Sequence, residues 1–133
     1  MAYSSILKPT DYFNTKLYTG NGGTLVNTGV GFQPDLCWLK IRSAADNHAL
    51  FDSVRGVHKR LASNLTAVES NRPTALTSFN SDGFTLGDNS ETNTSSATYA
   101  SWNWKAGGTA SSNTSGSITS SVSANQDAGF SIV

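Results

Sequence analysis

The sequence predicts an all-β domain, an antiparallel β-sandwich of jelly-roll or lectin-like type, and three observations support this. Ser, Thr, Asn and Gly supply 59 of the 133 residues, and these types favour turns and strand surfaces over long helices. Several short segments alternate apolar and polar residues with period two, as half-buried strands do. Aromatic residues reach 10%, which argues for a packed core and against disorder. A chain of this length is one domain that buries roughly two-thirds of its unfolded surface.

The first expected strand covers residues 12–18 and runs into the turn Gly20-Asn21-Gly22-Gly23. Asn-Gly is the strongest short hairpin signal, because both residues accept positive φ angles. Residues 24–26 are therefore expected to leave this turn as the second strand of a hairpin.

The strongest strand pattern covers residues 36–42. Period two places Cys37, Leu39 and Ile41 on one face and Leu36, Trp38, Lys40 and Arg42 on the other. Residues 48–54 are expected to pair with this strand in the antiparallel sense. That pairing would set Asp52 opposite Lys40 or Arg42.

Further elements complete the expected body. For residues 57–68, strand and loop are favoured over a short helix, although the apolar spacing is nearly helical. A hairpin is expected at 76–86 around Asp82-Gly83, followed by a connection at 87–96 and a last strand at 99–105. The inner faces of the sandwich are expected to carry Leu39, Ile41, Phe51, Phe84, Trp102 and Trp104.

The C-terminal part divides the chain into three regions. Residues 1–105 form the sandwich, residues 106–127 are a Ser/Thr/Gly-rich linker, and residues 128–133 are an isolated terminal strand. A strand this short cannot bury itself. It is therefore expected to pair with the body, with a neighbouring chain or with a following module.

Charge and hydropathy exclude several classes of function. Nine basic and nine acidic residues cancel, so no global field recruits nucleic acid or an anionic membrane. No segment approaches the roughly 18 apolar residues of a membrane span, and no signal peptide is evident at the N-terminus. The single cysteine, Cys37, excludes an internal disulfide and is expected to be buried.

Residue types with catalytic or metal-binding chemistry lack the spacing that such sites need. Only His48 and His58 can supply imidazole bases, and no Gly-x-Ser-x-Gly elbow occurs. The histidines show no recognised ligand spacing with Asp46 or Asp52. The loop around Asp82 is more typical of a turn than of a calcium site. We expect no enzyme activity, no cofactor and no metal.

Six blocks follow one another along the chain: YFNTKLYTGNGGT, GFQPDLCWLKIRS, LFDSVRG, SFNSDGFTLG, YASWNWKAG and AGFSIV. In this order they resemble repeat domains of tail-fibre-like and other virion surface proteins of tailed, particularly marine, bacteriophages. The resemblance covers nearly the whole chain. It implies a non-enzymatic structural module of the virion, made in the host cytoplasm, with a Ser/Gly-rich spacer before the opening strand of a following module. It supplies no catalytic residues.

Two functions are expected from these observations. The first is attachment, display and subunit assembly on a phage particle, with other virion proteins and copies of this chain as partners. In that case Phe130, Ile132 and Val133 complete the sheet edge of a neighbour by β-augmentation.

The alternative function is a carbohydrate-binding module that recognises host surface glycans by stacking on exposed aromatic rings. Trp38, Tyr99 and Tyr18 are the candidate rings for stacking. The candidate ligand or interface face comprises Trp38, Lys40, Arg42 and Asp52. An exposed Trp38 favours binding, whereas a covered Trp38 favours a structural role.

Overall fold

The structure, a computed structural model, describes residue 6 and residues 8–133; the other residues of the expected body lie outside the described part. Nearly all of its regular structure is β-strand. The elements are η1 (Pro9–Asp11), β1 (Phe13–Thr19), β2 (Leu25–Thr28), β3 (Leu36–Ile41), β4 (Ala49–Asp52), β5 (Lys59–Arg60), β6 (Ser70–Asn71), β7 (Leu76–Asn80), β8 (Gly83–Leu86), α1 (Ser90–Asn93), β9 (Thr98–Trp104), β10 (Ser111–Asn113), β11 (Ser120–Asn125) and β12 (Phe130–Ile132).

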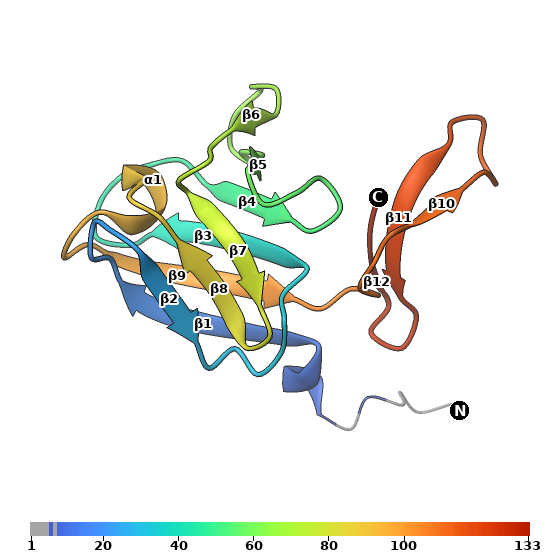
Figure 1. Cartoon of the computed structure of the whole chain (residues 1–133), viewed down its shortest axis with the longest axis horizontal. Helices are drawn as coiled ribbons and strands as arrows, with labels where there is room; N and C mark the ends of the chain where they lie inside the picture. The colour runs from blue at the N-terminus through green and yellow to red at the C-terminus, as the bar shows by residue number, and fades with distance from the viewer. Residues whose placement is uncertain (1–5, 7) are drawn as a thin grey trace.

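Two antiparallel sheets pack against each other and form the body. One sheet has the strand order β1-β9-β3-β4 and the other has the order β2-β8-β7, and Figure 1 shows the second sheet lying across the first. Tyr18 and Phe84 meet between the sheets, edge to face, with ring centroids 6.1 Å apart. The shared core includes Tyr18, Cys37, Leu39, Ile41, Phe51, Leu76, Phe84, Leu86 and Tyr99. The predicted all-β sandwich is confirmed.

Strand β3 follows the predicted alternation. Cys37, Leu39 and Ile41 are buried in the core, and the residues between them are half-buried on the opposite face. The neighbour β4 is antiparallel, as expected, with Cys37 opposite Phe51. Burial, with a smaller contribution from the charge of Asp35, raises the pKa of the Cys37 thiol.

Strands β1 and β2 do not form the predicted hairpin. Strand β1 pairs with β9 and β2 pairs with β8, so the turn between them carries the chain from one sheet to the other. The turn is bonded to the α1 segment instead of closing on itself. Asn21 N–H donates to Asn93 Oδ1 at 2.9 Å, and Asn93 Nδ2 donates to the carbonyl of Gly23 at 2.6 Å.

The predictions for residues 57–96 agree with the structure except in the connection. Residues 57–68 contain strand β5 and loop, as favoured over a helix. Strands β7 and β8 form the expected hairpin, with Phe79 opposite Phe84 and Asn80 opposite Gly83. The connection at 87–96 additionally folds into α1, which begins after the N-cap Asn89.

The two faces of β9 are the reverse of the prediction. Tyr99, Ser101 and Asn103 point into the core and are fully buried. Trp102 and Trp104 are half-buried on the outer face of the four-stranded sheet. The expectation that these two tryptophans line the inside of the sandwich is therefore wrong.

A hydrogen-bond network explains how β9 turns polar residues inward. Asn103 Nδ2 donates to the carbonyl of Asn14 at 3.1 Å and to Ser101 Oγ at 3.0 Å. Cys37 Sγ donates to Asn103 Oδ1 at 3.3 Å. Buried polar groups with partners escape most of the desolvation penalty, so the aromatic rings are not required on the inner face.

The predicted linker at 106–127 is wrong, and the predicted terminal strand is present as β12 but is not isolated. Strands β10 and β11 lie within 106–127, and β12 pairs antiparallel with β11, with Ser123 opposite Ile132. These three strands form a separate small sheet beside the body (Figure 1). The main chain at Gly107 packs closely against that of Ala124 in β11. A Cβ on Gly107 would lie 2.1 Å from the carbonyl oxygen of Ala124, so this approach requires glycine. Ser123 Oγ also bonds to the main chain on either side, accepting from Gly107 N–H and donating to the carbonyl of Gly108.

The C-terminal sheet is attached to the body at several points. The N–H of buried Ala106 donates to Asp35 Oδ2 at 2.8 Å. Arg55 Nη2 donates to the carbonyl of Val133 at 3.2 Å. Phe130 stacks on Trp104 with ring centroids 6.2 Å apart. The terminal strand thus returns to the body of its own chain.

Candidate functional site

All three tryptophans of the chain lie on the outer face of the four-stranded sheet. Strands β3 and β9 pair so that Trp38 stands directly opposite Trp102, and Trp104 follows two residues later on the same face. The rings of Trp38 and Trp102 have centroids 5.9 Å apart and planes inclined by 57°. Trp38, Trp102 and Trp104, which we call the tryptophan face, line a cavity of about 210 Å³.

The orientation of Trp38 is fixed by a neighbouring imidazole. Trp38 Nε1 donates to His48 Nδ1 at 2.8 Å, and the two rings meet edge to face with centroids 5.5 Å apart. His48 itself is held by its main chain, whose N–H donates to Asn64 Oδ1 at 3.0 Å. Because Nδ1 accepts, the proton of the neutral ring lies on Nε2.

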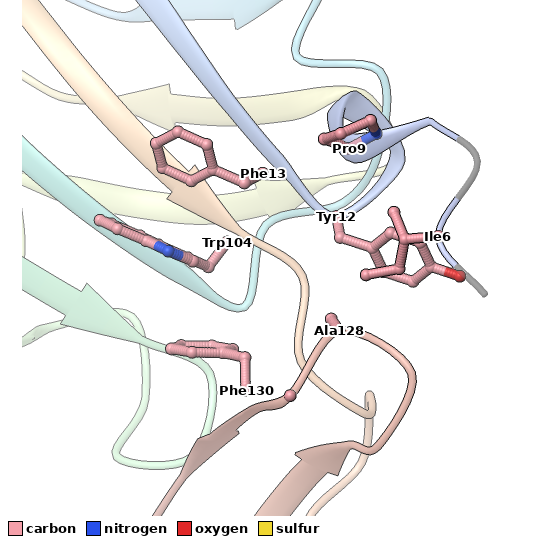
Figure 2. Close-up of a pocket in the computed structure, with 8 residues that line it drawn as sticks. Ile6, Pro9, Tyr12, Phe13, Trp104, Ala128 and Phe130 are labelled. Carbon is pink, nitrogen blue, oxygen red and sulfur yellow. The ribbon is translucent and has the colours of Figure 1, made fainter. Parts of the chain in front are cut away.

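Trp104 belongs to a second, larger hollow. Figure 2 shows Trp104 between Phe13 of β1 and Phe130 of β12, with Tyr12 at the side of the hollow. The Phe13 and Trp104 centroids are 4.9 Å apart. The cavity measures about 540 Å³ and lies between the body and the C-terminal sheet. Its lining residues are Ile6, Pro9, Tyr12, Phe13, Trp104, Ala128, Gly129 and Phe130.

Two of the four residues predicted for the ligand face share the outer face of β3. Trp38 and Lys40 lie there two positions apart, both half-buried. Lys40 Nζ donates to the carbonyl of Ile41 at 2.9 Å, so its ammonium group is held at the end of the strand. Arg42 follows β3 and is exposed.

Asp52 does not join this group. It stands opposite Leu36 at the far end of β3, so its predicted pairing with Lys40 or Arg42 is wrong. Its side chain is instead buried and forms an ion pair with Arg55. Asp52 Oδ1 also accepts from the N–H groups of Val54 and Arg55, at 3.0 and 2.8 Å. The role of this carboxylate is to stabilise the turn after β4.

The aromatic candidates other than Trp38 are not available for stacking. Tyr99 and Tyr18 are buried, and they stack on each other with centroids 4.9 Å apart and planes inclined by 6°. Tyr18 Oη donates to the carbonyl of Thr92 at 2.8 Å. Burial, followed by the nearby Tyr99 and Cys37, raises the pKa of the Tyr18 hydroxyl. Both tyrosines therefore hold the core.

The predicted assembly residues lie at the junction between the C-terminal sheet and the body. Phe130 packs on Trp104, and Ile132 is buried, whereas Val133 is 62% exposed. Strand β12 is the outer strand of its sheet, so one of its edges is unpaired within the described residues. Because Phe130 packs on Trp104, it forms part of the wall beside the tryptophan face.

Sequence reasoning identified Trp38 but missed Trp102 and Trp104 as members of the same site. The alternation of β9 did place the two tryptophans on one face. What misled the prediction was the assumption that large rings fill the core while Ser101 and Asn103 face solvent. The register of β9 against β3, which brings Trp102 opposite Trp38, carried no signal in the sequence.

The arrangement suits binding through ring faces. Half-buried indole rings present flat apolar surfaces, which stack on flat apolar surfaces of a ligand. Among the described residues, no group of three or more His, Cys, Asp or Glu side chains is placed to hold a metal ion. The described residues also contain no helix of the length and apolarity needed to cross a membrane.

Comparison with known proteins gives one family. Residues 8–133 match the family described as a domain of unknown function, DUF7483. No curated protein and no solved structure matches the chain.

Proposed function

We propose that this chain, which belongs to the DUF7483 family of domains of unknown function, is a non-enzymatic module that binds glycans through its tryptophan face. The observation that carries the proposal is the placement of Trp38, Trp102 and Trp104. The only tryptophans of the chain share one outer face and line one cavity.

The physical basis is the match between indole rings and pyranose rings. A sugar ring has two flat faces made of C–H groups and a rim of hydroxyls, so it stacks on an aromatic ring and hydrogen-bonds at its edge. Binding sites of this kind are mainly apolar with a few placed polar groups. The tryptophan face has this composition, with His48 and Lys40 as its polar neighbours.

The biological setting that we propose is the surface of a phage particle. The resemblance to virion surface repeat domains supports it, and the glycans would then be those of the host surface. The domain would act in attachment, displayed beside other virion proteins.

A direct test is glycan binding by the purified chain, first on a glycan array and then by calorimetry. Trp38→Ala and Trp102→Ala should each weaken binding about tenfold or more, as expected for aromatic anchors. Because every tryptophan lies in the site, the intrinsic emission should change on binding. Val26→Ala is the matched control, since Val26 is 58% exposed on the other sheet. Unchanged affinity in both tryptophan variants would exclude this site.

Assembly through the terminal strand is the second candidate function. One observation favours it, namely the edge of β12 that is unpaired within the described residues. An incoming strand from another copy or a following module would add to that edge by main-chain hydrogen bonds. In this form of assembly the terminal segment is not a free tail, because β12 pairs with β11 of its own chain and offers only its other edge.

A further inference from the structure

We infer that the site takes an extended, unbranched oligosaccharide of at least three sugar units with equatorial substituents, such as a β-1,4-linked glucan. This inference rests on the proposed function and specifies its ligand. The chain would cross Trp104, from the cavity at Trp38 and Trp102 to the cavity at Tyr12 and Phe130.

The sizes of the two cavities argue for an extended ligand. Pockets for small molecules usually measure about 300–1,000 Å³. The cavity of about 210 Å³ at the tryptophan face is below that range, whereas the neighbouring cavity of about 540 Å³ is within it. Trp104 lines both cavities. A ligand that fills only the first would leave the larger hollow and its aromatic walls unused.

Aromatic rings continue along this path. The ring centroids of Trp38 and Trp102 are 5.9 Å apart. The ring centroid of Trp104 lies 4.9 Å from that of Phe13 and 6.2 Å from that of Phe130. Figure 2 shows Phe13, Trp104 and Phe130 as successive rings along one side of the larger hollow, with Tyr12 across from them. Repeated flat rings fit a ligand with repeated flat faces.

Hydrogen-bond donors accompany the rings. The indole N–H of Trp38 is used by His48. The indole N–H groups of Trp102 and Trp104 have no hydrogen-bond partner within the described part of the chain. The same holds for the hydroxyl of Tyr12. None of these three donors is among the buried side-chain atoms without a partner in the described residues, so each reaches solvent and is open to a ligand. Three donors open to a ligand at the two cavities suit a ligand that carries hydroxyls on every unit.

The stereochemistry of the ligand follows from stacking. A pyranose with all substituents equatorial exposes only axial C–H bonds on both faces, which gives the flattest apolar surface. An axial hydroxyl would project into the indole ring and lose its own hydration.

The test is a calorimetric length series with glucose, cellobiose, cellotriose, cellotetraose and cellopentaose on the full chain. Affinity should rise about tenfold or more from cellobiose to cellotetraose and then level off. Tyr12→Ala and Phe130→Ala should reduce affinity for cellotetraose about tenfold, by a larger factor than they reduce affinity for cellobiose. Trp38→Ala should reduce both. Tyr12→Phe, which keeps the ring and removes the hydroxyl, separates hydrogen bonding from packing.

The possible failures are distinguishable. Equal affinity for all lengths, or stronger binding of manno-oligosaccharides than of cello-oligosaccharides, would overturn the inference. Binding of another glycan that depends on Trp38 while cello-oligosaccharides do not bind would also overturn it, but would leave the proposed function standing. Absence of binding to every array glycan would overturn both.

Discussion

Trp38 Nε1 donates a hydrogen bond of 2.8 Å to Nδ1 of His48. The bond crosses from β3 to the segment just before β4, and it fixes the plane of the indole ring that stands opposite Trp102. Nδ1 accepts this bond because an indole N–H can only donate. The orientation of the Trp38 ring is thus fixed by one contact between two side chains.

His48→Ala should weaken glycan binding about three- to tenfold. The reason is that a hydrogen bond contributes about 0.5–1.5 kcal/mol net, and Trp38 would sample orientations unsuited to stacking. Calorimetry measures the loss, and a shift of the tryptophan emission reports the change around Trp38. His58→Ala is the matched control because His58 is the other histidine and is exposed. Equal affinities of the two variants would show that the contact does not orient the site.

The sequence was sufficient for the parts of the fold that local patterns determine. The alternation in β3 placed Cys37, Leu39 and Ile41 in the core, and the Asp-Gly turn located the β7–β8 hairpin. Both features depend on residues close in sequence. The Asn-Gly turn after β1 carried the same local signal but joins two sheets, because Asn93, far along the chain, bonds to it.

The site itself required information that no local pattern contains. The inward face of β9 is decided by Asn103, whose partners Asn14 and Cys37 come from two other strands. Without those partners the tryptophans would be the better core residues. The C-terminal sheet was missed for a similar reason, since Ser123 acts through its hydroxyl bonds to Gly107 and Gly108.

Asn103→Ala should destabilise the domain by about 2 kcal/mol or more. The substitution leaves the carbonyl of Asn14 and the hydroxyl of Ser101 without their buried partner, and unsatisfied buried groups cost about 1–3 kcal/mol. Urea unfolding followed by circular dichroism measures the change. Asn71→Ala, at an exposed position on β6, should stay within about 0.5 kcal/mol. A similarly small effect at Asn103 would mean that the inward network does not stabilise β9.

Acid should weaken the link between the β7–β8 turn and the loop after β2. Asp82 accepts from the N–H groups of Gly31 and Gly29, at 2.6 and 2.9 Å, and these bonds lower the pKa of its carboxyl. A lowered pKa in the folded state contributes stability above the unfolded pKa of about 3.9, and this is lost as the pH falls through the folded value.

Asp82→Ala should therefore lower the melting temperature at pH 7, and the difference from the wild type should shrink as the pH falls below about 4. Thermal unfolding followed at a series of pH values measures this. Asp88→Ala is the control, because Asp88 is exposed. If the difference stays constant with pH, the stabilisation by the two glycine N–H groups does not depend on ionisation of the Asp82 carboxyl.

Strand sharing through β12 makes a prediction about mass in solution. By light scattering, the full chain should form an oligomer of the 14.0 kDa unit, and a version ending at Ala106 should be a monomer. The truncation removes β10, β11 and β12 but leaves both sheets of the sandwich, so the body should keep its circular dichroism. It also removes Phe130 from Trp104, which should become more accessible to quenching by acrylamide. Monomers in both cases, with the increase in quenching, would show that β12 serves its own chain as the wall of the glycan site and not as an assembly strand.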